Sequence, residues 1–331
     1  MPGSVTLDGI AATLQASRGV AAKRDIAAAV ARLGVAGKFS IPVGDDCAAI
    51  PDGDGFLLLA IEGFMNEFVA GDPWFAGWCG VMVNVSDVAA MGGRPIAVVD
   101  AIWAASEADA EPMLTGMREA SLAFGVPVVG GHTNTRTDRS QLSVAILGRA
   151  NRLLTSFEAK PGDRLVAAID LRGRYREPFS NWEAATDAPP VRLRGDLDVL
   201  PAIAEAGLVL AAKDISQGGI VGAAMMLAEC SGVAATIDVA AVPRPDGVPT
   251  ERWLQTFPSY GYVLAVPPTN VAAVIGRFAR RGIAAAEIGT IAAGRRVAIT
   301  DGYATETVWD FAREPLIGCG QLQFEKTEAL A

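Results

Sequence analysis

The residues of this sequence that could do chemistry are polar and acidic groups at the ends of apolar runs. They are Gly44-Asp45-Asp46, Glu62, Asn84 with Asp87, and Asp214-Ile215-Ser216. A carboxylate costs free energy beside apolar segments, so its repeated placement there indicates a shared role. Oxygen ligands of this kind favour divalent cations and the phosphates that accompany them. The pattern therefore predicts a site for metal and phosphate.

Some of these acidic positions also have a structural explanation. Asp-Asp pairs such as Asp45-Asp46 occur in solvated turns. Glu62 directly follows a buried strand, where a side chain is expected to reach a ligand crevice. Asp87 lies among apolar residues of a helix, so it must be paired, cap a helix or bind metal. Asn84, one turn earlier, either shares that ligand or orients Asp87.

Two glycine-containing turns add candidate phosphate groups. Gly130-Gly131-His132 follows the expected strand 126–129, and glycines there allow close backbone approach to a phosphate. His132 could donate to that phosphate or ligate metal, although a lone histidine is usually structural. Asp214 and Ser216 precede Gly218-Gly219 and a helix, whose first N–H groups suit an anion.

Hydrophobic periodicity predicts the elements that position these residues in the first half of the chain. A helix over 6–33 is interrupted at Ser17-Arg18-Gly19. Strands 47–50 and 56–61 form a hairpin rather than a calcium loop, because Gly63 stands where such a loop needs glutamate. The remaining elements are a helix over 75–91, strand 96–102, a helix over 107–124, and strands 126–129 and 142–147.

A second domain is predicted after the turn 159–163, which gives domains 1–152 and 153–331. The segment 171–196 is rich in arginine and proline, and we expect a long loop or lid there. The other predicted elements are strands 164–169, 208–212, 234–239, 261–266, 287–291 and 296–300, and helices 197–206, 220–230 and 269–281.

Composition excludes several classes of protein. The chain has 331 residues, of which 51% are hydrophobic, enough for two globular cores. A net charge of −9 with a pI near 4.8 argues against nucleic-acid or anionic-membrane binding. Cysteines 47, 79, 230 and 319 are widely spaced and predict free thiols. Without an apolar leader or a span of about 20 apolar residues, a soluble cytoplasmic protein is expected.

The sequence lacks the P-loop, the dinucleotide glycine fingerprint and the protein-kinase signatures. Its ordered motifs instead resemble the superfamily of aminoimidazole ribonucleotide (AIR) synthetase, thiamine-monophosphate kinase, selenophosphate synthetase and hydrogenase-maturation ATPases, most closely the AIR-synthase-related proteins. Beside the acidic motifs, the resemblance is carried by 84–92, 130–133, 159–163 and 288–291.

The resemblance implies a mixed α/β (α+β) fold with two PurM-like domains, of which the N-terminal sheet domain forms a homodimer. ATP would lie between the domains with several Mg²⁺ ions. Carried over by position, the metal ligands would be Asp46, Glu62, Asp87 and Asp214, and the ATP-binding residues Gly131, His132 and Ser216. Asp45, Asn84 and Gln217 are additional candidates for metal or substrate.

Departures from the family bear on the substrate. Thiamine-monophosphate kinases have Asp where this chain has His132 and Gln217, and Arg where it has Ser156. Candidate phosphate or substrate groups are Arg172, Arg174 and Arg176 in the arginine-rich segment, and Arg18 and Lys23 near the N-terminus. A solvated loop is the default explanation of the arginine-rich segment.

The sequence thus predicts a Mg²⁺-dependent ATP-using kinase or synthetase that acts on a small, anionic metabolite. Two alternatives are a non-catalytic nucleotide-binding regulator or scaffold and a divergent thiamine-monophosphate kinase. The acceptor and the phosphate that is cleaved do not follow from the sequence.

Overall fold

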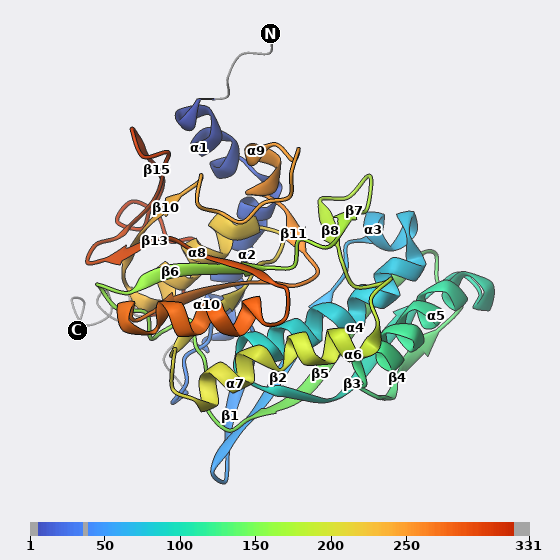
Figure 1. The fold of residues 1–331 in the computed structure, drawn as a ribbon. Coiled ribbons are helices and arrows are strands. Elements are labelled where there is room, and N and C mark those ends of the chain that lie inside the picture. Colours follow the sequence, from blue (N-terminus) through green and yellow to red (C-terminus); the bar gives the residue numbers. More distant parts are fainter. Residues whose placement is uncertain (1–5, 36–38, 321–331) are drawn as a thin grey trace. The chain divides into compact units, whose positions relative to one another are not determined.

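A computed structural model describes residues 6–35 and 39–320 and divides them into two compact units. We call them the five-strand unit, residues 46–153 and 185–205, and the seven-strand unit, the described residues of 1–45, 154–184 and 206–331. Figure 1 gives the labels of their helices and strands.

The five-strand unit is a mixed sheet with helices on one face. Its strand order is β1-β2-β5-β3-β4, with β3 and β4 parallel and the other neighbours antiparallel. The strands are β1 (Ala48–Asp52), β2 (Gly55–Gly63), β3 (Arg94–Trp103), β4 (Val128–Asn134) and β5 (Gln141–Ala150). The helices are α3 (Asn66–Gly71), α4 (Pro73–Ala90), α5 (Glu107–Phe124), α6 (Pro190–Leu197) and α7 (Val199–Glu205).

Helix α4 forms the core of this unit because it is apolar nearly all round. The Asp72 side chain caps it by accepting a hydrogen bond from Phe75 N at 3.1 Å, and Pro73 fills its first turn. Helix α4 packs on β5 and on α5, which runs beside it (Figure 1). All residues from Phe75 to Ala90 are consequently buried.

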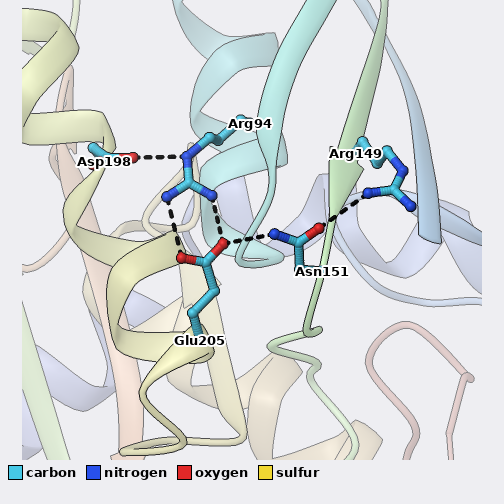
Figure 2. Close-up of polar contacts among 5 residues, drawn as sticks. All are labelled: Arg94, Arg149, Asn151, Asp198 and Glu205. Carbon is cyan, nitrogen blue, oxygen red and sulfur yellow. Dashed lines mark hydrogen bonds and ion pairs between the residues drawn. The ribbon is translucent and has the colours of Figure 1, made fainter. Parts of the chain in front are cut away.

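Helices α6 and α7 belong to the five-strand unit, although residues 154–184 of the other unit separate them in sequence from its strands. Figure 2 shows the polar network that attaches them: Arg94 lies between Asp198 and Glu205, and Asn151 joins Glu205 to Arg149. These groups are partly exposed, so each ion pair contributes roughly 0–1 kcal/mol. Together they fix where the segment docks.

The seven-strand unit has the strand order β15-β14-β10-β13-β6-β12-β9. The strands are β6 (Arg164–Ile169), β9 (Ala211–Asp214), β10 (Ala234–Asp238), β12 (Gly261–Val266), β13 (Ala284–Ala292), β14 (Arg296–Thr300) and β15 (Thr305–Asp310). A small sheet adds β7 (Arg174–Tyr175), β8 (Asn181–Glu183) and β11 (Phe257–Pro258).

Helices of the seven-strand unit cover its sheet. They are α1 (Leu7–Gln15), α2 (Arg18–Leu33), α8 (Gly219–Ser231), α9 (Thr250–Trp253), α10 (Val271–Ala279) and the 3₁₀ turn η1 (Pro268–Asn270). Residues of α1, α2 and α8 share one core cluster with inward residues of β6 and β12, such as Ala167 and Val263. Helix α10 packs on β6 and β13.

Three local expectations are wrong. Strand β4 does not end at Val129 but continues through Gly130-Gly131-His132 to Asn134, paired with β3. The segment 171–196 is not a structureless lid, because it contains β7, β8 and most of α6. Strand β9 spans Ala211–Asp214 rather than the expected 208–212, and Asp214 is therefore its last residue.

Candidate functional site

The Gly44-Asp45 turn is held firmly inside the seven-strand unit. Both carboxylate oxygens of Asp45 accept hydrogen bonds from Ser156, one from its backbone N and one from its Oγ, each at 2.7 Å. Ser156 is itself fully buried, and its carbonyl oxygen accepts a bond from Ser231 Oγ. Asp46 is half-buried and begins the five-strand unit. Asp45 is thus engaged in positioning the turn.

A buried carboxylate supports the same turn from the C-terminal side. Glu229 of α8, 1% exposed, accepts hydrogen bonds from the backbone N–H groups of Leu316, Ile317 and Gly318 at 3.0, 2.7 and 3.1 Å. Burial raises the pKa of Glu229, and the three N–H donors oppose that rise. The next residue along the chain, Cys319, packs against Gly44.

Gly44 has no room for a side chain. Its φ is +127°, and an added Cβ would lie 2.5 Å from the Cβ of Cys319. Burial raises the pKa of Cys319 to about 11 and that of Cys230 well above its ordinary value, so both thiols stay protonated. All four cysteines are free and buried, as the sequence predicted.

The Asp214-Ile215-Ser216 turn joins strand β9 to helix α8 in the seven-strand unit. Asp214 is buried at the strand end opposite Tyr262, and Ile215 N donates to Gly261 O at 2.9 Å. Gly219 N donates to Ser216 O at 2.8 Å and closes the turn at the start of α8. This places one carboxylate and one hydroxyl at the same strand-to-helix junction.

Helix α2 brings a cationic residue to this turn. Lys23 Nζ donates to Ser216 Oγ at 3.2 Å. The helix backbone also touches the turn, since a Cβ on Gly19 would lie 2.0 Å from Gln217 O. The structure therefore brings Lys23 to the adjacent candidates Ser216 and Gln217, which are far from it in the sequence. Arg18 lies at the start of the same helix.

In the five-strand unit, Glu62 and Asp100 lie on the helix-covered face of the sheet. Registers place Glu62, Val144, Asp100 and Gly131 side by side across β2, β5, β3 and β4. Their face is the buried one, because Val144 is fully buried. Burial raises the pKa of the Asp100 carboxyl. Sequence reasoning missed Asp100, and the available signal was one acid inside the apolar run 96–102.

Asn84 and Asp87 project from α4, which covers this face. Asn84 is fully buried, and its Nδ2 donates to Gly80 O at 2.8 Å and to Val144 O at 3.0 Å. Its Oδ1 has no hydrogen-bond partner within residues 6–35 and 39–320. Asp87 is buried one turn further along the helix. A buried amide oxygen without a hydrogen-bond partner can serve as a cation ligand.

His132 lies on the other, open face of the sheet. It pairs in register with Ala101, and its ring contacts that of Trp103 at 6.1 Å between centroids. Gly131, which precedes it, points to the helix-covered face. The two residues predicted to bind ATP together thus lie on opposite faces of β4.

Arg172, Arg174 and Arg176 of the arginine-rich segment belong to the seven-strand unit. Arg172 donates to both carboxylate oxygens of the buried Asp170, at 2.7 and 3.1 Å, and to Arg281 O at 3.0 Å. Arg174 lies in β7, opposite Glu183. Arg176 follows β7, and its backbone N donates to Asn181 O. The Arg172 guanidinium is thus oriented towards its own unit.

The acids do not form a ready-made metal cage. Among the described residues, no three His, Cys, Asp or Glu side chains are grouped so that they could hold a metal ion. Mg²⁺ requires less, because it keeps several waters and takes ligands from substrate phosphates beside one or two carboxylates. The helix-covered face, with Glu62, Asp100 and the leftover oxygen of Asn84, fits that requirement.

No helix among the described residues is both long enough and apolar enough to span a membrane.

Comparison with known proteins defines the class first. Both halves of the chain match AIR synthase related domains, the N-terminal domain over residues 44–150 and the C-terminal domain over residues 179–302. The chain belongs to the AIR synthase related family, which confirms the resemblance and the mixed α/β fold class.

Individual relatives differ in what is known of them. An uncharacterised protein of Synechocystis is 48% identical over 281 residues, covering 84% of this chain and 87% of that protein. The thiamine-monophosphate kinase of Halobacterium salinarum is 30% identical over 244 residues, covering 70% and 82%. Both relatives therefore match over most of their length.

A solved structure shows the same fold. T. maritima PurL complexed with ATP has a TM-score of 0.69 at 20% identity, over 82% of this chain. This chain spans 46% of that PurL chain.

Proposed function

We propose that this protein is a cytoplasmic, Mg²⁺-dependent enzyme that uses ATP to phosphorylate or phosphate-activate a small, anionic metabolite. Its family includes a kinase relative at 30% identity and the ATP-complexed PurL fold. Phosphoryl transfer asks a protein mainly for positioned cations and donors around phosphate oxygens. Metal ions would supply the charge that neutralises those oxygens.

The observation that carries the proposal is the turn at the end of β9. Asp214 ends β9, and two residues further on the Ser216 hydroxyl accepts a hydrogen bond from the Lys23 ammonium just before α8 begins. A carboxylate suits Mg²⁺, and an ammonium with a hydroxyl suits a phosphate oxygen. Lys23 is distant from Asp214 and Ser216 in the sequence, and the fold brings it to their turn.

The other family motifs are assigned by the same proposal. We assign Mg²⁺ to Asp46, Glu62 and Asp87 together with Asp214, and ATP to Gly131, His132 and Ser216. Asp45, Asn84 and Gln217 are additional ligand candidates. The candidates for binding phosphate or substrate are Arg18, Lys23, Arg174 and Arg176. Arg172 is a weaker candidate, because it already donates a hydrogen bond to Asp170.

The test is ATP turnover by the Asp87→Asn variant, with Asp138→Asn as the control. Asp138 is an exposed acid of the same unit, paired with Arg139. We expect Asp87→Asn to lose Mg²⁺-dependent turnover while its circular dichroism matches the wild type. Unchanged turnover would remove the metal assignment. If ATP binds but is not hydrolysed or transferred in the presence of every metabolite offered, a non-catalytic regulator is favoured.

A second candidate is a divergent thiamine-monophosphate kinase, favoured by the Halobacterium relative. Ser156, which stands where such kinases have arginine, is fully buried and bonded to Asp45. That position therefore cannot offer a cation to thiamine phosphate. Phosphorylation of thiamine phosphate in a direct assay would establish this candidate.

We also propose that the five-strand unit forms a homodimer through its open face. Large apolar side chains are exposed on this sheet, including Leu59, Ile61, Val99 and Val129, with Ile61 70% exposed. Such a patch on a soluble domain marks an interaction surface. A second copy of the same face would bury it with two-fold symmetry.

A further inference from the structure

We infer that Asp100 is an additional divalent-cation ligand, which acts with Glu62 on the helix-covered face of the five-strand unit. The inference rests on the proposed function, since it deepens the Mg²⁺ site proposed there. It concerns a residue that lies in none of the family motifs described above.

The carboxylate of Asp100 has no partner among the described residues. The residue is half-buried, and its side chain makes no hydrogen bond or ion pair with any residue that the structure describes. A carboxylate removed from water needs a cation or donors to offset its lost hydration. Sheet and helix supply neither, and the half-buried carboxylate stays within reach of solvent, so a hydrated cation can bind it.

Gly131 leaves space for this carboxylate. Gly131 stands beside Asp100 in the register of β3 and β4. A Cβ on Gly131 would lie 2.6 Å from the carboxylate carbon and from both of its oxygens. A Cβ on the neighbouring Gly130 would meet no described atom within 4 Å. Glycine is therefore needed at 131, where the carboxylate lies, and not at 130.

Asn84 of helix α4 supplies a further oxygen over this face. Glu62 and Asp100 flank Val144 on the same face, and two strand spacings separate their Cα atoms by about 10 Å. Asn84 lies over the strand between them, because its Nδ2 donates to Val144 O. Its Oδ1 is buried without a partner among the described residues. Two carboxylates and one amide oxygen can share one hydrated cation.

The experiment measures binding of Mn²⁺ alone, without nucleotide, by electron paramagnetic resonance of the free ion. The variants are Asp100→Asn and Gly131→Ala, with Gly130→Ala as the matched control. We expect Asp100→Asn to weaken Mn²⁺ binding roughly tenfold or more. Gly131→Ala should weaken it too, because the Cβ displaces the carboxylate, whereas Gly130→Ala should match the wild type. Circular dichroism and melting temperature establish that each variant is folded.

Three results would overturn the inference: no Mn²⁺ bound by the wild type, equal affinity in Asp100→Asn, or equal losses in Gly130→Ala and Gly131→Ala. The inference and the proposed function fail separately. If Mn²⁺ binding depends on Asp100 but the protein converts no ATP, the cation site is supported and the proposed enzymatic function is contradicted. If the wild type converts ATP and Asp100→Asn binds Mn²⁺ normally, the proposed function is supported and the role of Asp100 is contradicted.

Discussion

Removal of the Glu229 carboxylate should loosen the C-terminal segment that supports the Gly44-Asp45 turn. In Glu229→Ala, the N–H groups of Leu316, Ile317 and Gly318 lose their acceptor inside the protein. Hydrogen bonds to a charged group contribute about 1.5–3 kcal/mol each. The variant also escapes the cost of burying the charge, which offsets part of that loss. We expect a net destabilisation of about 3 kcal/mol.

The assay is thermal unfolding combined with amide hydrogen exchange. For a unit of this size, about 3 kcal/mol corresponds to a fall in Tm of roughly 6–12 °C. Exchange should quicken at Leu316, Ile317 and Gly318 before the rest of the unit. Glu158→Ala, an exposed glutamate of the same unit, is the control and should leave both unchanged. Equal Tm values for the two variants, with protected amides in Glu229→Ala, would refute the reasoning.

The pH dependence of Glu229→Gln gives an independent check. Burial raises the folded-state pKa of Glu229 above the ordinary 4.5. Folding therefore favours the neutral form of Glu229, and this contribution to stability is fully present below about pH 4.5 and is lost as the pH rises through the raised pKa. Glutamine does not titrate, so the difference in Tm between wild type and variant should narrow as the pH increases from 4 to 7. A difference that widens would contradict the assigned direction.

Three further predictions concern groups at other places in the chain. Lys23→Ala removes the ammonium beside Ser216 and should raise the KM for ATP about tenfold or more in steady-state kinetics. This corresponds to the loss of roughly 1.5–3 kcal/mol for a hydrogen bond to a charged group. An unchanged KM would show that Lys23 of helix α2 does not bind the nucleotide. Ile61→Lys places a charge on the open apolar face and should convert a dimer to a monomer in light scattering; an unaltered dimer would exclude that face. Arg172→Ala leaves the buried Asp170 without its bidentate partner and should lower the free energy of unfolding by about 1–3 kcal/mol in denaturant titrations. The KM for the anionic substrate should change little. A raised KM with unchanged stability would make Arg172 a substrate-binding residue.

Much of the fold could be predicted because the signals are local. Helix α5 begins and ends where its periodicity does, since Ser106 caps it and Gly125 terminates it in the left-handed region. Strands β6 and β12 match their continuous apolar runs residue for residue. The hairpin of β1 and β2 follows from the turn at Gly53-Asp54.

The remaining features depend on contacts between distant residues. Strand β4 continues through Gly130-Gly131 because β3 pairs with it, which overrides the low strand propensity of glycine. The partner of Arg172 is Asp170 in the folded chain, so a sequence pattern of arginines cannot tell a structural role from a ligand role. Asp100 belongs to no motif, and only the sheet register places it beside Glu62 and Gly131.

The most direct test of the central claim is calorimetric titration of ATP into the protein, with Mg²⁺ present and again after its removal with EDTA. The proposed function predicts saturable binding with Mg²⁺, its loss in EDTA, and its loss in Asp87→Asn. Binding with equal affinity in all three cases, or no binding in any, would contradict the account.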